Sequence, residues 1–257
     1  MTLAYNKEGS GDRTVLCITG LNGHAGFWTN FRKALSETCT VISFDQRGCG
    51  DNRAVAGEHT LAEIVSDTVA VLDDAGVESA IVVGHSMGGV ITQFLALDHP
   101  ERVRAAVFSG TFCVFDWYMQ NTNNLRMALL NKVGTEDCAR FSAMLAMPGG
   151  NVMDERYDLH SRITKVSSKA PDDVVMGRMR APYGFDRRAE LPRITAPSLV
   201  IGASDDLLAP LYQSQLIADA IPDARLEVMD GGHFFPNTRP ETYLEKVVPF
   251  IMSQPVD

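Results

Sequence analysis

The chain has 257 residues, a formal net charge of −9 at neutral pH and a pI near 5.1. It is long enough for one large hydrophobic core, and its composition excludes collagen-like and disordered classes. An acidic surface repels phosphate backbones, which argues against nucleic acid as a partner. The apolar runs are too short to cross a bilayer and the first ten residues do not resemble a signal peptide, so we expect a cytoplasmic protein without a membrane partner.

The cysteines and histidines show no metal-binding pattern. The sequence has five cysteines, with no C-x-x-C pair and no metal-ligand spacing to histidine: Cys17, Cys39, Cys49, Cys113 and Cys138. An odd number leaves at least one thiol unpaired in any disulfide scheme. We therefore predict reduced, mostly buried thiols, and neither a metal nor a cofactor.

Short apolar segments rich in β-branched residues alternate with helical patterns along most of the chain. They occupy residues 13–20, 39–48, 79–86, 104–110, 197–205 and 224–232, and residues 3–11 leave room for about one strand before them. Near-continuous apolar strands that alternate with helices are typical of a parallel sheet covered on both faces. The predicted fold class is therefore α/β.

Residues 59–76 show how the connecting helices are encoded. Thr60 and Glu63 have the spacing of a capping box, and apolar residues then recur at helical spacing. Gly76 supplies the residue type that most often ends a helix in a left-handed conformation. The segment predicts an amphipathic helix that begins after Thr60 and stops before Gly76.

The next segment, VVGHSMGGV at residues 82–90, contains a G-x-S-x-G motif around Ser86. A strand leads into the motif and an apolar helix follows it, which is the context of a nucleophile elbow. In so tight a turn the residues two positions before and after the serine must be small, and Gly84 and Gly88 meet this requirement. The alternative is that these glycines only allow a helix and a strand to pack closely.

The alternation of strands and helices is interrupted between residues 111 and 193. This stretch has helical patterns rich in methionine and aromatic residues but no convincing strand. We predict a helical cap inserted at 111–193 into a core formed by residues 1–110 and 194–257. Near the end of the chain, Pro249 interrupts a helical pattern, which predicts a short or bent terminal helix.

A serine nucleophile needs an imidazole base and a carboxylate that orients it. His233 follows the last predicted strand on a glycine-rich loop, so it is the predicted base. Two adjacent carboxylates end the strand before it, and we choose Asp205 as the acid, with Asp206 capping the next helix or facing solvent. Asp116, one strand earlier, is the alternative acid.

Acyl transfer also needs two donors for the oxyanion. The backbone N–H of Met87 follows the serine directly, and that of Leu21 lies in the glycine-rich loop GLNGHAGFW. We predict these two amides as the oxyanion hole. His24 in the same loop is predicted either to contact the substrate or to make a structural hydrogen bond.

Five segments together resemble the α/β-hydrolase superfamily, in the order in which that family has them: GLNGHAGFW, VISFDQRGCGDN, GHSMGG, GASDDLLAP and GGHFFPNTRPE. Within it, the second, fourth and fifth segments are similar to the aminoacrylate hydrolases of pyrimidine breakdown and, more loosely, to 3-oxoadipate enol-lactonases. The resemblance implies a structural role for Asp45 and Arg47, which would brace the loop after their strand. It covers nearly the whole chain outside the cap.

The resulting expectation is a cofactor-independent serine hydrolase that cleaves a small ester, lactone or activated amide or carbamate. The rival hypotheses are a small-molecule receptor with little turnover, a perhydrolase and a carbon–carbon bond hydrolase. If the substrate carries a carboxylate, as the resemblance implies, Arg126, Arg178 or Arg180 should face the pocket. Otherwise we expect these arginines at the surface. The oligomeric state stays open between a monomer and a homodimer.

Overall fold

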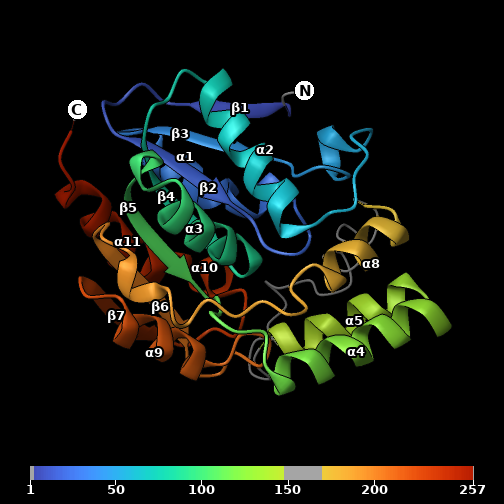
Figure 1. Ribbon diagram of the computed structural model, residues 1–257. Coiled ribbons are helices and arrows are strands. Elements are labelled where there is room, and N and C mark those ends of the chain that lie inside the picture. Colours follow the sequence, from blue (N-terminus) through green and yellow to red (C-terminus); the bar gives the residue numbers. More distant parts are fainter. Residues whose placement is uncertain (1–2, 148–169, 257) are drawn as a thin grey trace.

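A single seven-stranded sheet runs through the computed structural model, which describes residues 3–147 and 170–256. The strand order is β1-β3-β2-β4-β5-β6-β7, and only β1 is antiparallel to its neighbour. The strands are β1 (Tyr5–Glu8), β2 (Thr14–Ile18), β3 (Thr40–Phe44), β4 (Ala80–His85), β5 (Val103–Ser109), β6 (Ser198–Ala203) and β7 (Ala224–Met229). All six predicted core strands are present, so the α/β prediction is confirmed (Figure 1).

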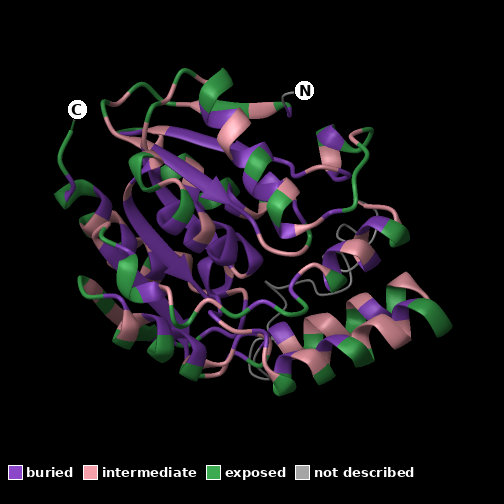
Figure 2. Ribbon diagram, viewed as in Figure 1, coloured by how far each residue is buried: buried purple, intermediate pink, exposed green. Residues whose placement is uncertain are grey.

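Alternate residues of each central strand enter two separate hydrophobic layers. In β2, Leu16 and Ile18 pack on one face, whereas Val15 and Cys17 pack on the other. Successive side chains of a strand point to opposite faces, so a strand that is apolar at every position needs a cover on both sides. The central strands are accordingly buried along their whole length (Figure 2).

Helices supply these two covers. The first layer includes α2 (Leu61–Asp74), α3 (Met87–Asp98) and α9 (Leu211–Ala220), and the second includes α1 (Thr29–Leu35) and α11 (Pro240–Ser253). The short helices are η1 (Ala25–Trp28), η2 (Gly50–Asn52), η3 (Pro100–Arg102), η4 (Leu191–Arg193) and α10 (Phe235–Thr238). Across the described ranges, no helix is long and apolar enough to span a bilayer.

The predicted limits of the helix after residue 59 are confirmed. In α2, the Thr60 side chain accepts a hydrogen bond from the Glu63 N–H, and the Glu63 side chain accepts one from the Thr60 N–H. Gly76 has a φ of +68° just beyond the helix. Both ends of α2 are therefore determined by local side-chain and backbone chemistry.

The expectation of a short terminal helix is wrong. Helix α11 is 14 residues long in all, and Pro249 lies inside it. Pro249 cannot donate a hydrogen bond to the carbonyl of Glu245, and both residues are exposed. Water can therefore satisfy that carbonyl. Meanwhile Tyr243, Val247 and Ile251 bury the opposite side of the helix against the sheet.

Between β5 and β6 the described residues form three α-helices, α4 (Trp117–Lys132), α5 (Thr135–Ala146) and α8 (Asp172–Arg180), before the short helix η4. Helix α4 packs against both α5 and α8. They lie together to one side of the sheet, beyond the arrowhead of β5 (Figure 1). A single β-bridge between Val114 and Asp186 brings the two ends of this insertion together.

Candidate active site

Ser86 stands at the sharp turn between β4 and α3. Its φ of 57° and ψ of −124° lie in a region that residues other than glycine rarely adopt. The turn is fixed by a hydrogen bond from Ser86 N–H to the Ser109 carbonyl at 2.9 Å and by one from the Thr111 hydroxyl to the Ser86 carbonyl at 2.7 Å. The backbone therefore holds the serine above the carboxyl end of the sheet.

The glycines of the motif are required by close backbone contacts. A Cβ atom on Gly84 would lie 2.3 Å from the Gly88 carbonyl oxygen, and one on Gly88 would lie 2.2 Å from the Ile18 carbonyl oxygen. Both distances are far below van der Waals contact. The prediction that both neighbours of the serine must be small is confirmed.

His233 connects the serine to a carboxylate. Its Nε2 lies 2.9 Å from Ser86 Oγ, and its Nδ1 lies 2.7 Å from Asp206 Oδ2. The Asp206 side chain is fully buried, and its other oxygen accepts hydrogen bonds from the Leu208 and Ala209 N–H groups, both at 2.8 Å. A carboxylate at Nδ1 favours the tautomer whose Nε2 can accept the serine proton.

The choice of Asp205 as the partner of His233 is wrong. Asp205 instead accepts hydrogen bonds from Gly231 N–H at 3.0 Å and Gly232 N–H at 2.9 Å, so it holds the loop that carries the histidine. Ser204 N–H still bonds across to Met229, which keeps the chain in the sheet one residue beyond β6. The chain turns out of the sheet only after Ser204. For this reason Asp206, and not Asp205, points toward His233.

The alternative acid, Asp116, is also placed elsewhere. It caps α4 through the Met119 N–H at 3.1 Å, and it accepts hydrogen bonds from Tyr212 and Gln213. Burial and the hydrogen bond to Asp116 raise the pKa of Tyr212 to about 12. Asp116 therefore stabilises the contact between α4 and α9.

The loop after β2 approaches Ser86 closely. A Cβ atom on Gly20 would lie 2.8 Å from Ser86 Cβ, so glycine is needed there. Neither Leu21 N–H nor Met87 N–H has an acceptor among the described residues. Within that part of the chain, nothing occupies either of the two predicted oxyanion donors.

Arg178 of α8 binds the same loop from the other side. Its Nε donates to the Leu21 carbonyl at 2.6 Å, its Nη2 donates to the Gly20 carbonyl at 3.1 Å, and Nη2 also donates to Gln46 Oε1. Its side chain is fully buried. The expectation that this arginine lies at the surface is wrong, because buried carbonyl oxygens surround it.

The other two candidate arginines differ from each other. Arg180, two residues later on α8, is exposed as expected. Arg126 of α4 lines the cavity above Ser86, so for this residue the surface expectation is wrong. Sequence patterns could not separate them, because α4 has almost no hydrophobic asymmetry to indicate which side faces inward.

The structural role expected for Asp45 and Arg47 matches their contacts. Asp45 accepts hydrogen bonds from His24 Nδ1 at 2.5 Å and from the Ala25 and Asp51 N–H groups. Burial alone would raise the pKa of Asp45, but these hydrogen bonds, that from His24 first, lower it. Arg47 makes a bidentate pair with Asp67 of α2.

Two roles were open for His24, a substrate contact or a structural hydrogen bond. Its hydrogen bond to Asp45 is the structural one, and its ring also borders the cavity.

His85, directly before the serine, is held away from Ser86. Its Nδ1 lies 3.1 Å from Ser109 Oγ, its ring stacks on Phe27, and its centroid is 5.0 Å from that of His233. Burial, reinforced by the nearby His233, lowers the pKa of His85 well below its ordinary value. His85 is therefore a neutral neighbour of the candidate base.

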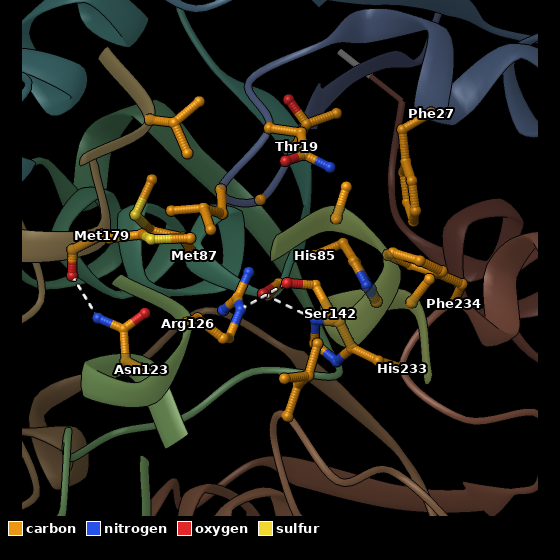
Figure 3. Close-up of a pocket in the computed structure, with 18 of the residues that line it drawn as sticks. Thr19, Phe27, His85, Met87, Asn123, Arg126, Ser142, Met179, His233 and Phe234 are labelled. Atoms are coloured by element: carbon orange, nitrogen blue, oxygen red, sulfur yellow. Dashed lines mark hydrogen bonds between the residues drawn. The ribbon is translucent and has the colours of Figure 1, made fainter. Parts of the chain in front are cut away.

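A cavity of about 450 Å³ opens above Ser86 and His233. The loop after β2, α4, α5 and α8 all contribute to its wall, and Figure 3 shows side chains from these separate segments around it. Its volume is in the range of small-molecule sites. In the part of the chain that the structure describes, no cluster of three or more His, Cys, Asp or Glu residues is arranged to hold a metal, and all five cysteines are free and buried.

Comparison with known proteins agrees with this geometry. The sequence pattern of the alpha/beta hydrolase family matches residues 15–246. The chain belongs to this family. It is 32% identical to "Putative carbamate hydrolase RutD" of Azorhizobium caulinodans, with 96% of this chain and 94% of the relative covered. It is 33% identical to the protein of the same name from Caulobacter vibrioides, with 97% and 95% covered.

A solved structure shows the same architecture. The enol-lactonase from Burkholderia xenovorans LB400 superposes with a TM-score of 0.88, covering 97% of this chain and 96% of that one at 23% identity. With its family and its relatives named as hydrolases, the chain is an alpha/beta hydrolase enzyme. The resemblance stated from the sequence is confirmed, both for the family and for its pyrimidine-catabolism and enol-lactonase relatives.

Proposed function

We propose that this protein is a serine hydrolase that cleaves a small carboxylic ester, lactone or activated amide or carbamate through an acyl-enzyme. The observation that carries the proposal is the continuous hydrogen-bonded series Ser86–His233–Asp206, with distances of 2.9 and 2.7 Å. The serine lies at a strained turn, at the floor of a cavity of small-molecule size. This arrangement is the one that makes a hydroxyl nucleophilic near neutral pH.

In the proposed reaction, His233 Nε2 takes the proton of Ser86 while Oγ attacks the carbonyl carbon. Asp206 stabilises the imidazolium that forms. His233 then gives the proton to the leaving alcohol or amine, and the acyl-enzyme remains. The same imidazole next removes a proton from the water that attacks the acyl group, and it gives this proton to Ser86 Oγ as the bond between Oγ and the acyl carbon breaks.

The negative charge on the carbonyl oxygen would be stabilised by Met87 N–H and Leu21 N–H. Met87 is the first residue of α3, so the positive end of that helix adds to the effect. Leu21 N–H belongs to the same peptide unit as the Gly20 carbonyl, which Arg178 binds. In a trans peptide the C=O and N–H point in opposite directions. Because Arg178 holds the Gly20 carbonyl toward α8, the Leu21 N–H points away from that helix.

We also propose that residues 111–147 and 170–193 act as a cap over a core made of 1–110 and 194–257; residues 148–169 of the predicted cap lie outside the described residues. Three helices of this segment border the cavity, and His233 N–H donates a hydrogen bond to the carbonyl of Ala146 at the end of α5. The relatives named as carbamate hydrolases and the neighbour named as an enol-lactonase support an activated, compact substrate.

The decisive experiment is Ser86→Ala. We expect loss of the acyl-enzyme burst and a fall in turnover of several orders of magnitude, with about 10³- to 10⁴-fold catalysis over water remaining. A panel of small esters, lactones and carbamates supplies the substrates. Labelling with a fluorophosphonate, located by peptide mass, checks that Ser86 is the modified residue.

Near-normal turnover in Ser86→Ala would contradict the mechanism. Very slow turnover of every generic ester by the wild-type protein, with intact ligand binding, would favour a receptor. Product analysis separates a perhydrolase or a carbon–carbon bond hydrolase from an esterase, because all three would use the same three side chains.

A further inference from the structure

Within residues 3–147 and 170–256, one cation faces the cavity and no carboxylate there balances its charge. Arg126 extends from the middle of α4, and it lines the same cavity as Ser86 and His233. Among the described residues that form the cavity wall, there is no aspartate or glutamate and no other arginine or lysine. Figure 3 shows Arg126 and Ser142 among the side chains around this space.

The contacts of Arg126 leave most of its hydrogen-bonding capacity unused. Its Nε donates to Ser142 Oγ at 2.9 Å, and that hydroxyl in turn donates to the Cys138 carbonyl at 2.7 Å. The side chain is thereby held in one orientation. In the described parts of the chain, neither Nη atom has a hydrogen-bond or ion-pair partner.

Other sheltered arginines of this protein have different partners. Arg47 and Arg187 each make bidentate pairs with carboxylates, whereas Arg178 donates to carbonyl oxygens through Nε and Nη2 and its buried Nη1 has no partner among the described residues. The two Nη groups of Arg126 instead face a largely apolar cavity. Burial lowers the pKa of Arg126, yet a guanidinium remains charged in proteins.

Arg126 is only partly exposed, so its guanidinium has lost part of its hydration, and an anion in the cavity would replace the lost interactions. The free fork of two Nη groups matches the geometry of a carboxylate. We propose that Arg126 is a specificity-determining residue that binds a carboxylate of the substrate, at a point separate from the bond that Ser86 attacks. This inference rests on the proposed function and narrows its substrate class to anionic acyl compounds.

The test uses two esters of matched length. Mono-4-nitrophenyl glutarate ends in a carboxylate, whereas 4-nitrophenyl pentanoate ends in a methyl group. We expect the wild-type enzyme to prefer the glutarate, after correction for its spontaneous hydrolysis. Arg126→Met should lower kcat/KM for the glutarate by about 10- to 100-fold and should leave the pentanoate within about threefold.

Two further variants separate recognition from general damage. Arg126→Lys keeps the charge but loses the fork, so we expect an intermediate preference. Arg140→Met removes a charge from α5 that is exposed and paired with Glu136 and Asp137 outside the cavity, so both esters should be hydrolysed as by wild type. An Arg126→Met variant that loses activity equally on both esters, or that keeps the wild-type preference, would overturn the proposal.

A binding experiment keeps the result independent of turnover. In a Ser86→Ala background, titration calorimetry with monomethyl glutarate should show binding that dimethyl glutarate lacks and that Arg126→Met abolishes. If wild type neither hydrolyses the esters nor reacts with a fluorophosphonate, the proposed function fails, and Arg126-dependent binding alone supports the anion site. Binding that is the same with and without Arg126 would refute it.

Discussion

Asp205 and Asp206 are chemically identical and adjacent, yet they have different tasks. Asp206 is buried and binds His233, whereas Asp205 binds the backbone of the loop that carries His233. One carboxylate orients the imidazole and the other positions its loop. A substitution that preserves side-chain shape at each position should therefore separate the two effects.

Asp206→Asn should lower kcat by about 10⁴-fold, because an amide donating to Nδ1 favours the imidazole tautomer that cannot accept the Ser86 proton. The matched variant Asp205→Asn keeps an oxygen for the two glycine N–H groups and should stay within about tenfold of wild type. Steady-state kinetics on one activated ester measures both. A larger loss in Asp205→Asn than in Asp206→Asn would reverse this assignment.

At the scale of elements, helix α8 and the loop after β2 are joined through one side chain. Arg178 lies 157 and 158 positions from the two carbonyls that it binds, and no other side chain in the described ranges makes hydrogen bonds to them. The insertion is therefore coupled to the peptide that presents Leu21 N–H. Helix α8, which borders the cavity, and the proposed oxyanion donor cannot move independently without breaking these contacts.

Arg178→Met should lower kcat by about 10- to 100-fold with a smaller change in KM, because the Gly20–Leu21 peptide would lose its fixed orientation. Arg178→Lys should recover part of kcat, since an ammonium can reach one carbonyl. Arg180→Met on the same helix is the control and should behave as wild type. Urea unfolding of each variant shows whether it is folded, and a change in KM alone would contradict a positioning role.

At the scale of the molecule, the parallel sheet brings distant segments to one edge. Ser86 and His233 are 147 positions apart, but each follows the carboxyl end of a strand. The same packing buries His85 beneath the site in neutral form. Its buried ring makes the stability of the whole domain sensitive to pH.

The direction of this pH dependence follows from proton binding by the folded and unfolded chains. Below a pH of about 6.5 the unfolded chain protonates the His85 ring and the folded protein does not, so the free energy of unfolding falls as the pH falls. The contribution is about 1 kcal/mol for each pH unit below that value. Urea unfolding at pH 7.5 and 5.5 should show a smaller loss for His85→Phe than for wild type. His99→Gln, which removes a half-exposed ring, is the comparison variant.

Several features could be predicted because they depend on neighbours in the chain. The capping box of α2, the glycines around Ser86 and the two-sided apolar strands are all local patterns, and each is present. The continuation of α11 through Pro249 could not be predicted, because it depends on burial of the opposite side of the helix against the sheet. The inward direction of Arg126 and Arg178 is likewise set by packing between distant helices.

The sequence by itself determined the α/β class, the strand order along the chain, the elbow at Ser86 and the histidine that follows the last strand, because periodicity and turn chemistry act over a few residues. Only the tertiary structure decided which carboxylate meets His233 and which arginine faces the cavity. Those outcomes depend on where a turn closes and on which side of a helix is covered. Both are properties of contacts between segments far apart in the chain.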